Sequence, residues 1–262
     1  MEDCFDYIIV GAGSAGCVLA NKLSENEKNT VLLIEAGGKD TNLFIHMPSG
    51  YSQIVPKASN QNYGFETEPE SNTAGRKLYW PRGKGWGGSS SINAMIYTRG
   101  HSSDYDHWRQ LGNPGWSYDD VLPYFKRAEN YEGDGDQEYH GKNGPLNVKK
   151  STRDDDILLD KFVEAGSQAG FPLTNDFNGK QQEGFSRYEH TIKGSKRFSS
   201  ARAYLYPALK RKNLYTKTNI TVDKVIFKNK KAIGVEYFEK GKKIFSTCNR
   251  EVILSSGAVN SP

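Results

Sequence analysis

The chain has 262 residues, of which 35 are Lys or Arg and 31 are Asp or Glu, giving a net charge of +4. These charges are interspersed rather than gathered in one segment, so a nucleic acid is not an expected partner. No apolar run is long enough to span a bilayer, and the first motif begins too near Met1 for a cleaved signal peptide, so we expect a cytoplasmic protein without a transmembrane segment.

The first predicted unit is a strand, a turn and a helix at the N-terminus. The apolar run from Tyr7 to Val10 leads into Gly11-Ala12-Gly13-Ser14-Ala15-Gly16, and apolar residues then recur at helical spacing up to Leu23. The three glycines permit a tight turn, a close approach of the backbone to a pyrophosphate, and packing of the helix against the sheet. The pyrophosphate would lie at the helix N-terminus. The alternative is a glycine-rich turn that binds no ligand.

A second apolar run, residues 31–34, ends on Glu35. A carboxylate at that position can accept hydrogen bonds from both hydroxyls of an adenosine ribose and would repel a 2′-phosphate. Together the two runs predict a dinucleotide-binding βαβ unit whose ligand has no 2′-phosphate. This pattern does not distinguish FAD from NAD.

The segment from Trp80 to Met95 is unusually rich in glycine. Four of the six residues 83–88 are glycine, which excludes a stable helix or strand there. Such a segment is either a flexible linker or a place where the backbone lies close to a ligand. Its two tryptophans and the apolar residues that follow favour close approach to a ligand.

Further elements are predicted along the rest of the chain. Helices are expected from Tyr118, with Ser117 as N-cap, over 156–169 with Gly170 as the stop, and over 199–209. An antiparallel meander is predicted from the β-rich runs 222–228, 232–238 and 243–247. It feeds the apolar strand 251–254, which ends in small residues and is expected to return to the sheet beside the cofactor.

The three cysteines, Cys4, Cys17 and Cys248, are far apart and have no C-x-x-C spacing, so we interpret them as reduced structural thiols. Cys17 lies in the first turn of the predicted phosphate-binding helix, where the helix dipole would lower the pKa of a reactive thiol. The alternative, which we favour, is a small residue that packs against the sheet.

In these motifs the chain resembles the glucose-methanol-choline (GMC) oxidoreductases, in particular their choline or alcohol dehydrogenase-like branch. The resemblance covers essentially the whole chain. It rests, in this order, on residues 6–16, 33–37, 81–84, 87–97, 99–101, 104–106, Trp108 and 256–258.

The resemblance implies FAD rather than NAD, in an enzyme that oxidises a primary alcohol by hydride transfer to flavin N5. It implies that the stretch from Asn93 to Ile96 lies against the isoalloxazine and that the backbone of Val222 meets the adenine. Members with covalently bound flavin carry a histidine just before this asparagine, and because Ile92 stands there in this chain, noncovalent FAD is expected. Gly85 takes the place of a more usual Val or Thr.

The expected cofactor-binding residues therefore come from several separate segments, and no metal site is expected. They are Gly11, Ala12, Gly13, Ser14, Ala15, Gly16, Glu35, Ala36, Gly85, Gly88, Asn93, Ala94, Met95, Ile96, Val222, Gly257 and Ala258.

No catalytic residue is expected within this chain. Structural or surface roles are predicted for its five histidines, because no acid stands at a fixed spacing from any of them. In the family, the catalytic histidine and its partner come from a C-terminal half beyond the position of Pro262. The chain is thus expected to be the N-terminal, FAD-binding part of a longer enzyme. The alternatives are a catalytically inactive flavin-binding fragment and an NAD-dependent Rossmann dehydrogenase. The histidines are His46, His101, His107, His140 and His190.

The expected partners are a small-molecule alcohol and an electron acceptor, either a quinone or oxygen, and the resemblance is compatible with peripheral contact with the inner membrane. The expected fold class is α/β: a Rossmann-like FAD-binding βαβ domain with an antiparallel β-meander and part of an α+β substrate domain. Four segments are expected: the βαβ unit at 1–45, its continuation with the flavin-contacting loop at 46–150, part of the substrate domain at 151–195, and the meander with its return strand at 196–262.

Overall fold

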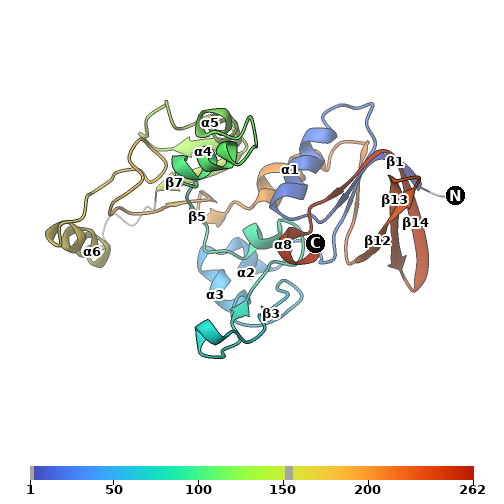
Figure 1. The fold of residues 1–262 in the computed structure, drawn as a ribbon, viewed down its shortest axis with the longest axis horizontal. Coiled ribbons are helices and arrows are strands. Elements are labelled where there is room, and N and C mark those ends of the chain that lie inside the picture. Colours follow the sequence, from blue (N-terminus) through green and yellow to red (C-terminus); the bar gives the residue numbers. More distant parts are fainter. Residues whose placement is uncertain (1–2, 151–155) are drawn as a thin grey trace. The chain divides into compact units, whose positions relative to one another are not determined.

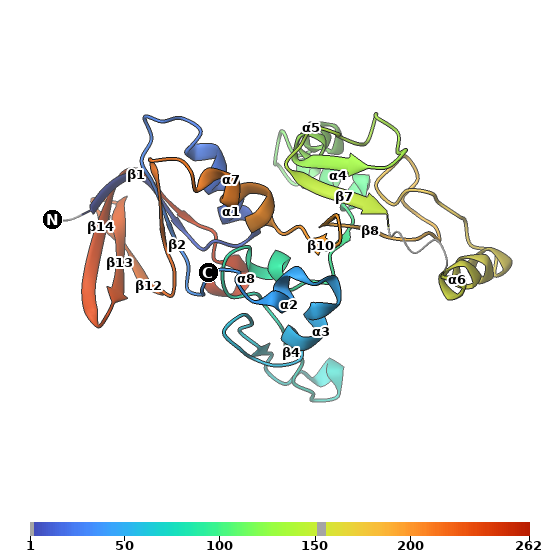
Figure 2. The ribbon, with the colours of Figure 1, turned by 180° about the vertical axis from the view of Figure 1, so that it is seen from behind.

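A computed structural model of the chain describes residues 3–150 and 156–262, and Figures 1 and 2 show its ribbon from opposite sides. The chain forms two compact units, one from Met1–Ala94 with Lys196–Pro262 and one from Met95–Ser195. Residues 95–150, expected to continue the cofactor domain, fall in the second unit. Residue 151, where a domain boundary was expected, lies outside the described residues.

The first unit is built on a six-stranded sheet with the order β11-β2-β1-β14-β13-β12. β1 (Asp3–Val10) lies parallel to β2 (Val31–Ile34), which in turn lies parallel to β11 (Leu214–Lys217). β14 (Lys242–Leu254) is parallel to β1, and β13 (Lys231–Glu239) and β12 (Val222–Lys228) extend the sheet in antiparallel fashion. This arrangement confirms the predicted α/β fold with its antiparallel meander.

One strand differs from the prediction. The runs 243–247 and 251–254 were expected to be separate strands, but β14 is continuous through both. It pairs with β13 through its first part and with β1 from Ser246 to Leu254. The register against β1 shifts between Phe5 and Tyr7, opposite the exposed polar residues that interrupt the apolar pattern. A bulge of this kind takes up extra residues without ending the strand.

One helix of the first unit packs against β1 and β2 of this sheet. α1 (Ser14–Leu23) buries Gly16, Cys17 and Ala20. The helix predicted over 199–209 is a π-helical segment, Ala201–Leu205, that continues into α7 (Tyr206–Ala208). The remaining elements are α2 (Leu43–His46), α3 (Tyr51–Ile54), β3 (Phe65–Glu66), β4 (Tyr79–Trp80), β10 (Lys196–Arg197), α8 (Gly257–Asn260) and 3-10 turns at Pro48–Gly50, Ser71–Thr73 and Gly88–Ser91.

The second unit has a four-stranded sheet with the order β5-β8-β7-β6. β6 (Glu129–Glu132) and β7 (Leu146–Lys150) are parallel, whereas β8 (Glu189–His190) is antiparallel to both β7 and β5 (Ile96–Tyr97). The unit also holds α4 (Ser102–Gln110), α5 (Tyr118–Ala128), α6 (Ile157–Gln168) and β9 (Ile192–Lys193).

The predicted helix ends in this unit are confirmed. Ser117 caps α5 through a capping box with Asp120, and Gly170 follows α6 with a φ of 86°. The apolar residues of α6 do not form a buried face, however, since Leu158 is 81% exposed and Phe162 is 65% exposed.

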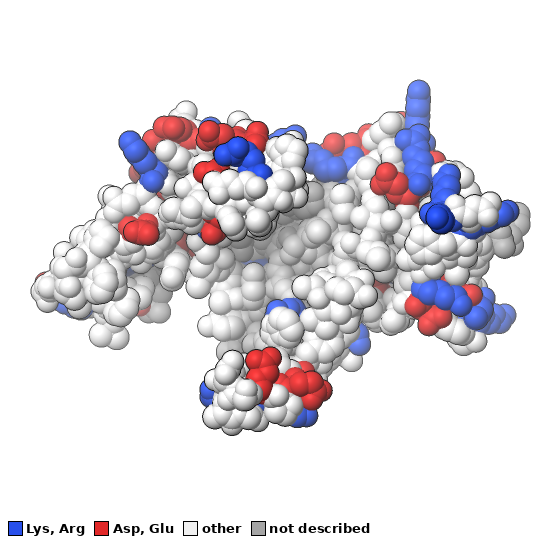
Figure 3. Space-filling view, in the orientation of Figure 1, with Lys and Arg blue, Asp and Glu red and all other residues white. Residues whose placement is uncertain are grey.

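Charged side chains of both signs share the exposed strands of the meander, where Figure 3 shows blue and red groups close together. The carboxylate of Glu236 lies 3.3 Å from the Lys224 ammonium and 3.0 Å from that of Lys243. Among the described residues, no helix has the length and apolar character needed to cross a membrane.

Candidate functional site

The turn between β1 and α1 packs against the end of β14. Gly11 has a φ of 102°, and a Cβ atom there would lie 2.6 Å from the carbonyl oxygen of Ser255. The Ser255 hydroxyl donates to the carbonyl of Gly11 at 2.8 Å, and its backbone N–H donates to Val10 at 2.8 Å. The strand that was predicted to return to the sheet thus ends beside the first glycine motif.

The other two glycines of the motif differ in the space around them. A Cβ at Gly16 would lie 1.9 Å from the carbonyl oxygen of Gly11, so the helix can approach the turn only without a side chain there. A Cβ at Gly13 would meet nothing closer than 3.8 Å. Gly13 is the N-cap of α1 and offers no side-chain acceptor to the first N–H groups of the helix. Helix N–H groups left in this way favour an anionic ligand.

Glu35 lies at the end of β2, and its carboxylate accepts three backbone hydrogen bonds. Oε2 accepts from Ala12 at 2.7 Å, and Oε1 accepts from Gly37 at 2.8 Å and from Gly85 at 3.0 Å. The residue is buried. A carboxylate has about four acceptor positions, so this count leaves one for a ligand. The expectation that Glu35 binds both ribose hydroxyls stays a prediction, and these bonds leave room for a hydrogen bond from one of them.

These elements line a cavity of about 1040 Å³ in the first unit. Its wall includes the glycine turn, the end of β2, the start of β12 and the segment after β14. Ten of the residues expected to bind the cofactor belong to it: Gly11, Gly13, Ser14, Ala15, Glu35, Ala36, Gly88, Val222, Gly257 and Ala258.

The structure places the other expected residues elsewhere. Ala12 and Gly16 are buried behind the wall, and Gly85 lines a neighbouring cavity of about 330 Å³. Asn93 and Ala94 are exposed and do not line either cavity.

Met95 and Ile96 begin the second unit. Met95 is buried and has a φ of 64°, a left-handed conformation that is strained for a residue with a side chain. The expected contact of Asn93 to Ile96 with a flavin stays a prediction.

Four side chains of the wall were not among the residues expected to bind the cofactor: Tyr63, Phe65, Arg82 and Lys84. Tyr63 and Phe65 stack with ring centroids 5.0 Å apart, and the Arg82 guanidinium lies 4.3 Å from the centre of the Trp80 ring. Burial raises the pKa of Tyr63, and the Glu35 carboxylate adds to this effect. Lys84 completes the set. The two cations were visible within the glycine-rich segment as Arg-Gly-Lys, whereas the aromatic pair lies in a stretch without periodicity.

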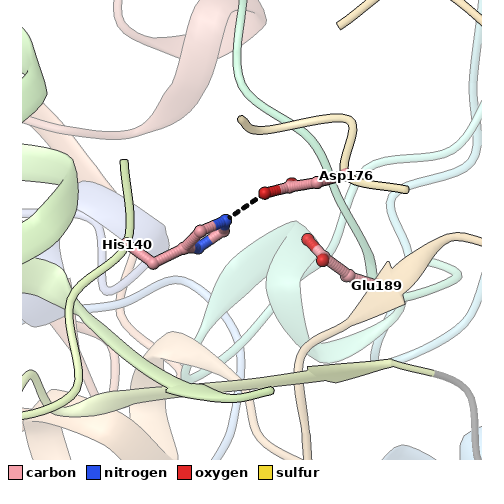
Figure 4. Close-up of side chains that lie close together, drawn as sticks. All are labelled: His140, Asp176 and Glu189. Carbon is pink, nitrogen blue, oxygen red and sulfur yellow. Dashed lines mark hydrogen bonds and ion pairs between the residues drawn. The ribbon is translucent and has the colours of Figure 1, made fainter. Parts of the chain in front are cut away.

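A second group of polar residues is buried in the second unit. His140 lies between two acids. Its Nε2 lies 2.7 Å from Asp176, the bond that Figure 4 marks, and its Nδ1 lies 3.1 Å from Glu129. Its ring stacks on Tyr131. Burial lowers the pKa of His140, but the hydrogen bonds to Asp176 and Glu129 outweigh it and raise the pKa to about 9. No pattern in the sequence indicates this pairing, because the two acids lie at unrelated distances along the chain from His140.

Candidate metal ligands of this group are His140, Asp176 and Glu189, whose ligand atoms lie within 4.8 Å of one another. Those atoms already have hydrogen-bond partners. Glu189 accepts from the Tyr131 hydroxyl at 2.5 Å and from the Asn178 amide at 2.9 Å, and His140 bonds to both of its acids. The cluster is consistent with the structural role predicted for the histidine.

Cys17 is buried, and burial raises its pKa to about 12. Its thiol donates to the carbonyl of Ala12 at 3.2 Å. The packing role that we favoured is supported, and a thiol activated by the helix dipole is not.

Comparisons with known proteins agree on one family. The family model described as GMC oxidoreductase matches residues 5–262. Mitochondrial choline dehydrogenase of Homo sapiens is 46% identical over 270 residues, with 100% of this chain and 45% of the relative covered. Oxygen-dependent choline dehydrogenase of Photobacterium profundum is 47% identical, with 100% and 46% covered. The chain thus spans about half the length of these relatives.

Solved structures give the same result. Pyridoxine 4-oxidase from Mesorbium loti has a TM-score of 0.93 at 33% identity, over 98% of this chain and 50% of that one. A formate oxidase has a TM-score of 0.89 at 26% identity, over 100% of this chain and 47% of that one.

Proposed function

Since this chain belongs to the GMC oxidoreductase family, we propose that it binds FAD noncovalently and forms the cofactor-binding part of an enzyme that oxidises a primary alcohol of the choline type. The observation that carries the proposal is the 1040 Å³ cavity, whose wall joins an uncapped helix N-terminus to a buried carboxylate. The relatives named choline dehydrogenases support the substrate class.

The residues of the wall fit the parts of FAD. The N–H groups at the start of α1, together with the cations Arg82 and Lys84, favour a diphosphate. The remaining acceptor position of Glu35 fits a ribose hydroxyl, and the stacked Tyr63 and Phe65 offer an aromatic surface to a ring system. When bound, FAD would supply the acceptor for a hydride from the alcohol.

Ile92 supports noncovalent binding. It is buried in an apolar cluster with Ile45 and Ile54. An isoleucine has no nucleophilic atom with which to attach a flavin, and the apolar cluster around it offers none. FAD would then be held by hydrogen bonds, charge and packing alone.

The alternative is a flavin-binding part that does not turn over substrate by itself. One observation favours it, since no histidine is found among the described residues of the cavity wall. We assign no general base within this site. The relatives named oxygen-dependent favour oxygen over a quinone as the electron acceptor of the whole enzyme.

The test is reconstitution of the purified chain with FAD, followed by gel filtration and acid precipitation. We expect flavin absorbance to travel with the protein and then to appear in the acid supernatant. Flavin that stays with the precipitate would contradict noncovalent binding, and a colourless protein would contradict the FAD site. NAD serves as the control ligand. Dye-linked oxidation of choline by the reconstituted chain separates the enzyme from the inactive flavin-binding part.

A further inference from the structure

Arg197, in β10, is among the largest fully buried side chains of the chain, at 2% exposure. Its guanidinium donates three hydrogen bonds to neutral oxygens. Nε donates to the carbonyl of Ile45 at 2.7 Å, and Nη1 donates to the carbonyl of Ser90 at 3.3 Å and to Oδ1 of Asn93 at 2.8 Å. Nη2 is buried and has no hydrogen-bond partner within the described part of the chain.

No carboxylate lies within ion-pair distance of this guanidinium among residues 3–150 and 156–262. Burial lowers the pKa of Arg197 to about 10, so the group still carries its charge at neutral pH. A buried cation without a counter-ion is costly, and so is a buried donor without an acceptor. Both features indicate that a further electron-rich group belongs near Arg197.

The hydrogen-bond partners of Arg197 belong to segments that line the cavities or are expected to contact the cofactor. Asn93 opens the stretch expected to lie against the flavin. Because Arg197 donates to Oδ1 of Asn93, the oxygen end of this amide points toward the guanidinium. Ser90, the second partner, lies in the turn Gly88–Ser91, of which Gly88 and Ser89 line the 1040 Å³ cavity. The Arg197 side chain therefore holds both Ser90 and Asn93 in the segment that is expected to contact the cofactor.

We infer that Arg197 is a positioning residue that orients Asn93 toward the flavin and provides a buried positive charge that stabilises the flavin once it is reduced. This inference rests on the proposed function. Oxidation of the alcohol delivers two electrons and one proton to the flavin as a hydride, while the hydroxyl proton leaves separately, so the reduced flavin gains one negative charge. A nearby uncompensated cation in a buried setting raises the midpoint potential of that couple.

The experiment compares four forms of the FAD-reconstituted chain: wild type, Arg197→Met, Arg197→Lys and Asn93→Asp. The midpoint potential is measured by equilibration with reference dyes, FAD affinity by flavin fluorescence, and folding by thermal unfolding of the FAD-free protein. We expect a lower potential in Arg197→Met and a potential near wild type in Arg197→Lys. Asn93→Asp keeps the acceptor oxygen but supplies a counter-charge, so its potential should also fall while the protein stays folded.

Arg202→Met is the matched control, because it removes one arginine charge from a half-buried residue that lies 3.5 Å from Asp40 instead. Its potential should equal that of the wild type. Equal potentials in Arg197→Met, Asn93→Asp and the wild type would overturn the role of Arg197 and leave the proposed function standing. A wild type that takes up no FAD would overturn both. If Arg197→Met does not fold, Asn93→Asp, which retains Arg197, decides.

Discussion

The carboxylate of Glu35 accepts a hydrogen bond from the backbone N–H of Gly85 at 3.0 Å, although the two residues lie 50 positions apart. The same carboxylate holds Ala12, in the first glycine motif, at 2.7 Å. One buried anion therefore ties the β1–α1 turn to the glycine-rich segment. This gives Glu35 a structural role in addition to the ligand role expected from its position after β2.

Replacement of Glu35 by Gln tests that role. The amide keeps the size of the side chain but replaces one acceptor oxygen with a donor, which leaves at least one buried backbone N–H without a partner. We expect the free energy of unfolding of the FAD-free protein to fall by about 2 kcal/mol, measured by urea denaturation. FAD affinity should fall as well. A Gln variant as stable as the wild type would show that the three N–H groups find other acceptors.

A pair of alanine substitutions separates packing from ligand binding within one motif. Gly16→Ala would place a methyl group 1.9 Å from a carbonyl oxygen, so we expect a loss of stability of about 3 kcal/mol or more. Gly13→Ala has room in the FAD-free protein and a φ of −72°, so its stability should change by less than about 1 kcal/mol.

Two quantities are measured for this pair of variants. Urea denaturation without FAD gives the stability, and flavin fluorescence gives the FAD affinity. Because Gly13 lines the cavity, the methyl group of Gly13→Ala occupies space that the pyrophosphate needs, and FAD affinity should fall sharply with the fold intact. Unchanged FAD affinity in Gly13→Ala would place the pyrophosphate elsewhere.

The local motifs were predictable from the sequence because each depends on neighbouring residues. The glycine turn, the strand that ends on Glu35 and the cap at Ser117 were predicted and are present. The sequence could not show that β14 is one strand, because the polar residues in its middle end the apolar pattern but not the backbone pairing.

Long-range pairings were beyond prediction for a different reason. The bonds from Arg197 to Ile45 and Asn93 join residues more than 100 positions apart, and no spacing rule connects them. His140 and its two acids are a similar case, since β6 and the loop before β8 bring them together. Such contacts follow from the tertiary fold alone.

The cysteines give a prediction about reactivity. Cys4 is exposed, whereas Cys17 and Cys248 are buried and burial raises the pKa of both thiols. A thiol reagent should modify one cysteine rapidly in the native protein and all three in denaturant, because the thiolate is the reactive form. Cys4→Ser should remove the rapid phase. Rapid modification that persists in Cys4→Ser would mean that a buried thiol is accessible.

His140 gives a prediction about pH. Its pKa is raised in the folded protein to about 9, above the ordinary value of 6.5, by its bonds to Asp176 and Glu129. The stabilisation from the charged ring is therefore complete below pH 6.5 and is lost as the pH rises toward 9. The loss over that interval should reach up to about 3 kcal/mol. This loss of stability can be measured by urea unfolding at a series of pH values. Hydrogen exchange of residues 126–150 gives the local readout.

His140→Gln should be less stable than the wild type at pH 6 and should not show the decline between pH 6.5 and 9, because the amide does not titrate. His107→Gln is the matched control, since His107 is exposed on α4, and it should keep the wild-type decline. If the wild type were equally stable at pH 6.5 and 9, the buried ring would be neutral in the folded protein.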